Sequence, residues 1–164
     1  MTPPKPSPQT PPPAFEPEFV AGLRQMFEQS IPFNRVLGIE LVGLSGQQAQ
    51  CAIQMRPELV GHYVHQRLHG GVISAVLDAT AGLAVMAAIG ARHMGETPAQ
   101  RLQRFLKLGT IDLRVDYLRP GLGERFIASA EVMRLGSRVA STRMRFEGAG
   151  GALLATGSAA YIVS

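Results

Sequence analysis

The sequence of 164 residues is poor in cysteine, and poor in proline beyond its first segment. Cys51 is the only cysteine, which excludes an intramolecular disulfide framework and is consistent with a reducing compartment. Eight of the 12 prolines fall within residues 1–17. Such a stretch builds neither helix nor sheet, so we expect an extended, largely disordered tail over residues 1–14. Residues 15–164 are enough for one domain with its own core.

Targeting and membrane signals are also scarce. The proline-rich N-terminus has no apolar h-region, so no secretory signal is predicted and a cytoplasmic location is expected. One long apolar run, residues 70–91, would span a bilayer by length alone. It contains five Gly or Ser residues and an aspartate, however. We interpret it as the central helix of a soluble protein and predict no membrane partner.

Positive charge is concentrated in one part of the chain. Residues 92–145 hold 11 of the 16 Lys and Arg residues but only five of the 12 acids, a local balance of +6. No recognition helix, zinc finger or aromatic RNA-binding motif accompanies them, so no nucleic-acid partner is predicted. The basic half suits a small anionic ligand such as a nucleotide phosphate. A solvated, arginine-rich sheet surface is the alternative.

The first half of the chain predicts one amphipathic helix and a hairpin before the long helix. Apolar residues follow helical spacing over residues 16–31, and Pro32 is expected to end that helix. Strands are expected within residues 36–46 and 47–57, joined by a turn at Ser45 and Gly46. Residues 58–67 are expected to form a loop.

The second half predicts one short helix and four strands. The short helix is expected from Pro98 to Leu108, within a polar and basic insertion. Polar and apolar residues alternate over residues 110–119, and further strands are expected in residues 124–135, 138–147 and 152–163. The pattern predicts an α+β fold, in which an antiparallel sheet wraps the long helix or that helix is shared with a second subunit.

Asp78 is the only charged residue between Gly70 and Ala91. An unpaired buried carboxylate destabilises a protein by several kcal/mol, so its presence in an apolar helix requires compensation. The carboxylate could face a pocket that holds water and substrate. Alternatively, it could be hydrogen-bonded to neighbouring hydroxyls or backbone, and Ser74, one turn earlier, could supply such a bond.

Gly70 and Gly71 stand where the long helix is expected to start. Their N–H groups lack intrahelical partners, and glycine allows another group to approach closely. With the positive end of the helix dipole they could stabilise an oxyanion. They could also serve only to pack the helix tightly against the sheet.

Two segments together carry a resemblance to a known family. LHGGVISAVLD, residues 68–78, followed by GTIDLRVDYLRPG, residues 109–121, resembles the hotdog-fold acyl-CoA thioesterase superfamily. It is similar to the phenylacetyl-CoA thioesterase-like branch and to bacterial medium- and long-chain acyl-CoA thioesterases. The resemblance implies a curved sheet around one long helix, and homodimers or homotetramers that hydrolyse acyl-CoA at subunit interfaces without a metal or other cofactor.

The resemblance also implies roles for residues at the start of the long helix. Asp78 would be the catalytic carboxylate, either as a general base or as a nucleophile, and Gly70 would polarise the thioester carbonyl. The two lie about 12 Å apart along one helix, so Gly70 of one subunit is expected to work with Asp78 of another. Gly71 and Val72 are expected to contact substrate, and Val76, Leu83 and Met86 to continue the acyl-chain wall.

The histidines before the helix include a departure from the family pattern. Relatives usually carry Asn seven, or in other branches six, residues before the histidine of HGG, where this chain has His62 and Tyr63. His62 is expected to help position the attacking water, with a pH sensitivity that an amide would not produce. His69 is expected to brace the entry to the helix. A zinc site of His62, His65 and His69 is the alternative, and no metal is predicted.

Arginines at strand ends are candidates for the phosphates of coenzyme A. Arg119 and Arg138 are expected to bind substrate, and Arg125 and Arg134 are further candidates. Two other functions remain open for this fold: a non-catalytic acyl-CoA-binding protein, and a hydratase or dehydratase.

Overall fold

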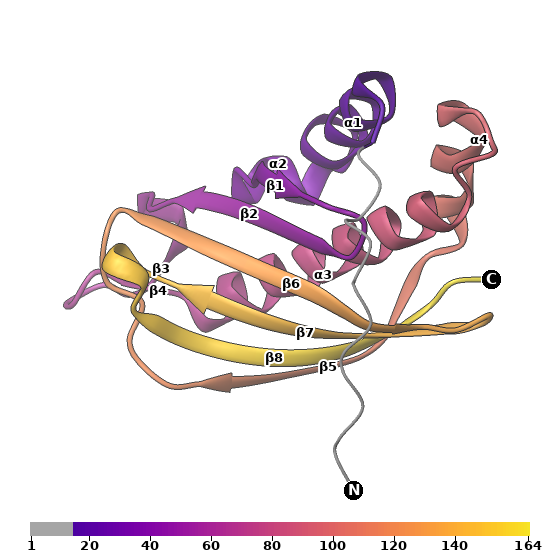
Figure 1. The fold of residues 1–164 in the computed structure, drawn as a ribbon. Coiled ribbons are helices and arrows are strands. Elements are labelled where there is room, and N and C mark those ends of the chain that lie inside the picture. Colours follow the sequence, from indigo (N-terminus) through magenta and orange to yellow (C-terminus); the bar gives the residue numbers. More distant parts are fainter. Residues whose placement is uncertain (1–14) are drawn as a thin grey trace, which may run out of the picture.

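The structure, a computed structural model, describes residues 15–164 (Figure 1). The tail predicted for residues 1–14 lies outside the described residues. The helices and helical turns, in chain order, are α1 (Pro17–Arg24), a π-helical turn η1 (Gln25–Ser30), α2 (Pro32–Leu37), η2 (Pro57–Leu59), α3 (Gly70–Arg92), α4 (Pro98–Gln103), η3 (Arg104–Lys107) and η4 (Ala149–Gly151). The strands are β1 (Glu40–Leu44), β2 (Gln48–Gln54), β3 (Val60–His62), β4 (Arg67–Leu68), β5 (Gly109–Tyr117), β6 (Arg125–Leu135), β7 (Val139–Glu147) and β8 (Leu153–Ile162).

Six strands form one antiparallel sheet in the order β1-β2-β6-β7-β8-β5. Side chains alternate between its two faces, so β7 buries Ala140, Thr142, Met144 and Phe146 and exposes the residues between them. Figure 1 shows α3 running along the inner face of this curved sheet. The predicted α+β architecture is therefore confirmed.

Helix α3 is the centre of the core. It is long and apolar enough to cross a membrane, but 67% of its most apolar 18-residue stretch is buried inside the fold. The side chains of Val76, Leu77, Leu83 and Val85 are fully enclosed. Burial against the inner face of the sheet accounts for the apolar run, as expected from the sequence.

Two local predictions are corrected in the first half of the chain. Pro32 does not only end a helix: it occupies the first turn of α2, where a missing N–H is tolerated. Gly38 then adopts a left-handed conformation with φ of 66° and ends α2. The first strand, β1, therefore begins at Glu40, within the predicted residues 36–46. Residues 58–67, expected to form a loop, contain η2 and the hairpin of β3 and β4.

The segment after α3 is locked to α1 by a buried arginine. Arg101 of α4 is fully buried, and its guanidinium carbon lies 4.4 Å from the centre of the Phe19 ring. Its Nη2 donates to Glu16 Oε2 at 2.6 Å, and this bond lowers the pKa of Glu16. The α4 helix itself starts with a capping box between Thr97 and Gln100. Arg101 therefore fixes the position of the basic insertion on the core.

We predict that Arg101→Ala lowers the free energy of unfolding by about 3 kcal/mol, because it removes a buried cation–π contact and leaves a cavity beside Phe19. Chemical denaturation measures the change. Arg24→Ala is the matched control, since Arg24 is half-exposed and forms only a surface pair with Glu28; it should change stability by about 0.5 kcal/mol or less. Equal effects of the two substitutions would contradict this role for Arg101.

Candidate active site

The start of α3 is held by the hairpin before it and by the loop after β5. The N–H of His69 donates to the Leu59 carbonyl, and the N–H of Leu68 donates to the Gly121 carbonyl, both at 2.9 Å. A Cβ on Gly61 would lie 2.7 Å from His69 Cα, so only glycine allows the hairpin to approach this closely. These contacts fix the direction in which α3 begins.

His69 caps α3. Its Nδ1 accepts a hydrogen bond from the Gly71 N–H at 2.8 Å. An acceptor at Nδ1 requires a neutral imidazole with its proton on Nε2. The expected bracing role of His69 matches this contact, and the contact also occupies the Gly71 N–H. Gly71 therefore cannot offer that donor to a ligand while the cap is formed.

Gly70 keeps its N–H free. Within residues 15–164 no group accepts from it, whereas its carbonyl accepts from the Tyr117 hydroxyl at 2.9 Å. A Cβ on Gly70 would touch the Tyr117 ring at 3.4 Å. An open cavity of about 390 Å³ lies beside this residue, lined by Arg67, Leu68, Gly70, Ile73 and residues 117–121. The positive end of the α3 dipole and a free donor thus face a space that a carbonyl could enter.

The carboxylate of Asp78 is half-buried and asymmetrically bound. Its Oδ1 accepts from the Tyr161 hydroxyl at 2.8 Å and from the Thr110 hydroxyl at 3.0 Å. No described group donates to Oδ2. Ser74 does not supply the bond considered from the sequence, since its hydroxyl donates to the Gly71 carbonyl. Neighbouring hydroxyls therefore hold one oxygen of Asp78 and leave the other available.

Tyr161 acts as a permanent donor to Asp78. Burial, and then the adjacent Asp78 carboxylate, raise the pKa of Tyr161 well above its ordinary value. A phenol that stays protonated can only donate to the carboxylate. The one cysteine lacks comparable reactivity, because burial raises the pKa of Cys51 to about 12 and a thiol at neutral pH is a weak nucleophile. Asp78 is accordingly a stronger candidate than Cys51 for the catalytic base or nucleophile.

The other predicted site residues are divided between the two ends of α3. Val72 is half-buried near the start of α3, and Arg119 lines the Gly70 cavity while donating to the Leu153 carbonyl at 2.7 Å. His62 is exposed on β3, and its ring stacks on His65 with centroids 4.8 Å apart. Arg138 lies on the turn between β6 and β7, where Leu135 to Ser137 line a different cleft. Arg119 and Arg138 therefore do not share one pocket within a single chain.

The expected acyl-chain wall is only partly accessible. Val76 and Leu83 are fully enclosed in the core, so they cannot contact a ligand without rearrangement. Val72 and Met86 remain half-buried on α3. The sequence pattern could not separate these positions, since all four are apolar residues of the same helix.

Three site residues were missed in the sequence. Thr110 and Tyr161 hold Asp78, and Arg67 lines the Gly70 cavity with a buried Nε that has no partner in the described part of the chain. Thr110 stands inside the motif strand and could have been found from it. No sequence pattern near Tyr161 or Arg67 indicates a site residue. The strand order of the sheet brings Tyr161 to α3, and the β3–β4 hairpin brings Arg67 there.

Metal-ligand side chains do not gather anywhere in residues 15–164: no group of three or more His, Cys, Asp or Glu is placed to hold an ion. Of the three histidines considered for zinc, His69 uses its Nδ1 in the helix cap. A larger hollow of about 730 Å³ lies on the outer sheet face. It is lined by paired charges such as Arg114 and Asp116, away from the candidate site.

A curved antiparallel sheet around one helix, with a carboxylate on that helix and a free N–H at its start, defines a protein of the hotdog class. The chain belongs to the thioesterase superfamily, since the model of that family matches residues 65–155. Membership confirms the resemblance seen in the sequence, and it identifies the chain as a thioester hydrolase.

Two relatives are named medium/long-chain acyl-CoA thioesterase YigI. The protein of Escherichia coli K12 is 42% identical over 139 residues, which cover 85% of this chain and 90% of the relative. That of Salmonella typhimurium is 41% identical over the same length and coverage. The chain is thus similar to these enzymes over nearly their whole length.

Solved structures show the same fold. A crystal structure from Shewanella oneidensis, related to the thioesterase superfamily, is 38% identical with a TM-score of 0.83, covering 92% of this chain and 100% of that one. Zebrafish thioesterase superfamily member 2 has a TM-score of 0.69 at 20% identity, covering 88% of this chain and 96% of that one. The second likeness shows the fold alone.

We predict that His69→Ala lowers the free energy of unfolding by about 1 kcal/mol, because the N–H of Gly71 loses its cap. His69→Asn should recover most of this loss, since asparagine is a good N-cap residue. Urea denaturation of the three proteins measures the differences. A His69→Ala protein as stable as the parent would show that the cap contributes nothing.

Proposed function

We propose that this protein hydrolyses acyl-CoA thioesters to a free acid and coenzyme A, at sites formed between two copies of the chain. The carrying observation is the Asp78 carboxylate, with Oδ1 fixed by two hydroxyls and Oδ2 free. The acyl-CoA substrate is taken from the name of the relatives at 42% identity. We include in the proposal the cytoplasmic location expected from the sequence.

The need for two copies follows from the length of α3. Eight residues separate Gly70 from Asp78, or about 12 Å of helix, too far for both to contact one thioester. Strand β5 lies at the edge of the sheet and has a free hydrogen-bonding side, which favours pairing with another strand. It also exposes Ile111 and Tyr117, and the nearby Leu118 is half-exposed. A second copy along β5 would cover this apolar surface.

The hairpin of β3 and β4 provides further apolar surface for a partner. Tyr63 is 81% exposed and Val64 62% exposed at its tip. Side chains of this size are normally covered, and contiguous exposed apolar surface marks contact sites. We therefore propose a symmetric dimer in which β5 and this hairpin face the second subunit, and a dimer of such dimers remains compatible with it.

In the proposed reaction, the thioester carbonyl accepts a hydrogen bond from the Gly70 N–H. Asp78 of the partner subunit takes a proton from water through Oδ2, and the water oxygen attacks the acyl carbon. The tetrahedral oxyanion is stabilised by the Gly70 N–H and the α3 dipole. Its collapse breaks the carbon–sulfur bond, and the departing thiolate takes up the proton. His62 is proposed to help position the water.

A second route uses the same residues. Oδ2 of Asp78 attacks the acyl carbon directly, the thiolate leaves, and water hydrolyses the resulting anhydride. In both routes Tyr161 and Thr110 hold Oδ1 and so aim Oδ2. Each route releases one free thiol per turnover, which separates it from the two other functions considered for this fold. An acyl-CoA-binding protein or a hydratase would leave the thioester intact.

We predict that Asp78→Asn lowers kcat for thiol release from medium- and long-chain acyl-CoA by about a hundredfold or more, the scale of losing a positioned acid–base group. A thiol-trapping assay measures the rate, and circular dichroism checks the fold. Glu131→Gln is the matched control, because Glu131 is exposed on the outer face of β6 and should leave kcat within about twofold. Unchanged turnover in Asp78→Asn would exclude the proposed role.

A second prediction concerns Gly70 and the shared site. Gly70→Pro removes the N–H and adds a ring in its place. The helix start should tolerate it, since proline is favoured at the first helical position and His69 already has the extended backbone that a following proline requires. We expect a loss of kcat of about a hundredfold, the scale of one oxyanion donor. Gly70→Ala keeps the donor and is the control for the added Cβ.

Mixing the two inactive chains tests the interface. If each site takes Gly70 from one copy and Asp78 from the other, a heterodimer of Gly70→Pro and Asp78→Asn chains has one intact site. Random exchange of subunits should restore about a quarter of the parent activity. A mixture no more active than its components, with exchange verified by mass spectrometry, would show that the site lies within one chain.

A further inference from the structure

A second cleft lies at the far end of α3 from the Gly70 cavity. It encloses about 520 Å³ between the last turn of α3, the α4–η3 segment, the turn between β6 and β7, and the end of β8. Figure 1 shows α4 beside the C-terminal end of α3, with the chain terminus nearby. Residues 96–107 of the basic insertion form one wall. This cleft has no role in the reaction steps proposed above.

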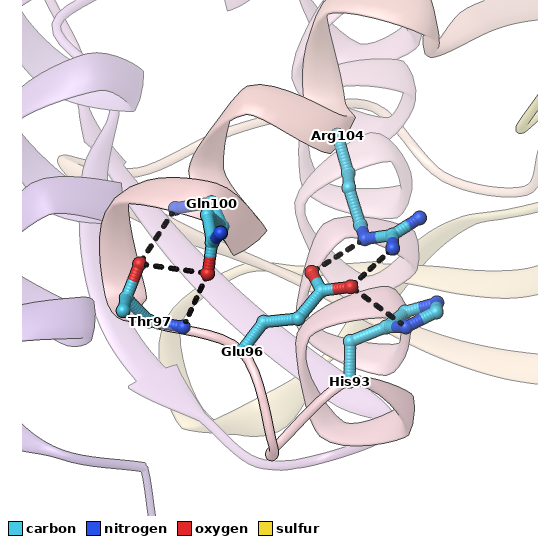
Figure 2. Close-up of polar contacts among 5 residues, drawn as sticks. All are labelled: His93, Glu96, Thr97, Gln100 and Arg104. Atoms are coloured by element: carbon cyan, nitrogen blue, oxygen red, sulfur yellow. Dashed lines mark hydrogen bonds and ion pairs between the residues drawn. The ribbon is translucent and has the colours of Figure 1, made fainter.

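The one acidic side chain lining the cleft is already engaged (Figure 2). Glu96 binds Arg104 through two hydrogen bonds, one of them from Nε to Oε2 at 2.7 Å, and His93 Nδ1 lies 3.5 Å from Oε1. The hydrogen bond from Arg104, followed by the nearby cations, lowers the pKa of Glu96, so it remains ionised. The capping box of Thr97 and Gln100 fixes the backbone beside this network.

The opposite wall is fixed by Arg92. Its guanidinium donates to the carbonyl of Gly136 at 3.1 Å and to that of Leu135. These two carbonyls belong to the turn that carries Ser137 and Arg138. Arg92 thus holds the turn against the end of α3, and the position of Arg138 follows from that support.

Three cations at this cleft have no ion-pair partner within residues 15–164: Arg92, Lys107 and Arg138. Arg92 is engaged by the two carbonyls of the turn, which leaves Lys107 and Arg138. The sheet register brings them to the same place. Ile162 pairs with Gly109 on one side and with Val139 on the other, so Lys107 and Arg138 flank the end of β8. Two strand spacings put Gly109 and Val139, the strand residues that follow these two cations, about 10 Å apart. Long side chains from both sides can reach one anion between them.

The charge around the cleft favours an anion of more than one charge. Arg92, Arg104 and Lys107 line it together with one acidic side chain, Glu96, and with the C-terminal residue Ser164. Arg138 directly follows the lining residue Ser137. Lysine and arginine bind phosphate oxygens through charge-assisted hydrogen bonds. A cleft with this surplus would concentrate a phosphorylated ligand from solution.

We propose that this cleft, through Lys107 and Arg138, binds phosphate groups of the nucleotide half of acyl-CoA while the thioester reaches Asp78. The inference rests on the proposed function. Asp78 and Arg92 are separated by 14 residues of α3, about 21 Å, whereas Lys107 is only three residues from Thr110, which binds Asp78. The extended arm that joins the nucleotide of coenzyme A to its sulfur spans distances of this order.

The test compares decanoyl-CoA with decanoyl-pantetheine, which has the same thioester but no phosphate. In each of Lys107→Gln and Arg138→Gln, the ratio of kcat/KM for the CoA substrate to that for the pantetheine substrate should fall about tenfold, the effect of one charge-assisted hydrogen bond. The double variant should lose more. Added salt should lower the same ratio in the parent protein.

Arg145→Gln is the control of equal charge change. Arg145 is exposed on the outer sheet face and pairs with Glu147, so the ratio should stay within about twofold of the parent. If the double variant behaves like this control, the cleft is not a phosphate site. A loss that is equal for both substrates would likewise overturn the proposal, because it would reflect altered structure rather than a lost phosphate contact.

Two further arms separate the source of the phosphate and the proposed function itself. The same variants are assayed with decanoyl-phosphopantetheine on an acyl carrier protein, which carries one phosphodiester. If their kcat/KM relative to decanoyl-pantetheine falls for this substrate and not for decanoyl-CoA, the site belongs to carrier-protein substrates. Calorimetry with adenosine bisphosphate tests the cleft without any turnover. If the parent protein binds this nucleotide but releases no thiol, the hydrolase proposal is refuted and the phosphate site stands. If it hydrolyses acyl-CoA but does not bind the nucleotide, only the phosphate site is refuted.

Discussion

The hydrogen bonds that Tyr161 and Thr110 donate to Asp78 Oδ1 join the central helix to two strands of the sheet. Without them the carboxylate would be an uncompensated charge beside an apolar core. The same Tyr161 hydroxyl lies 2.9 Å from the Asp78 carbonyl oxygen, so its single proton is shared between the backbone and the side chain of Asp78. Because Thr110 belongs to the edge strand, the carboxylate sits at the border between the core and the unpaired side of the sheet.

The two halves of α3 on either side of this position differ in burial. From Thr80 to Gly90 only Met86 is not buried, and this half packs against the sheet as an ordinary core helix. Before Thr80, several residues including Val72, Ala75, Asp78 and Ala79 remain half-buried. One helix therefore supplies stability through its second half, while its first half is less covered by the sheet and contributes Gly70 and Ile73 to a cavity. A partner subunit would complete the burial that the sheet does not provide.

The elements that the sequence predicted well are those with strong local periodicity. The alternation over residues 124–163 led to three strands whose bounds agree within two residues, and the apolar run led to α3. The hairpin of residues 60–68 was missed because its strands are short and carry no alternation. Asp78 stood out as a lone charge, but Tyr161 lies 83 residues further on, and only the strand order places it there.

The two ends of α3 carry opposite poles of the helix dipole, and they would act differently on one anionic substrate. The N-terminal end carries the positive pole of the helix dipole, which adds to the free Gly70 N–H that is proposed to bind the thioester carbonyl. The C-terminal end carries the negative pole, which repels phosphates. Arg92 in the last turn offsets that pole while binding the β6–β7 turn. The cations that remain, Lys107 and Arg138, come from outside the helix, and their charge is therefore available to a ligand rather than consumed by the dipole.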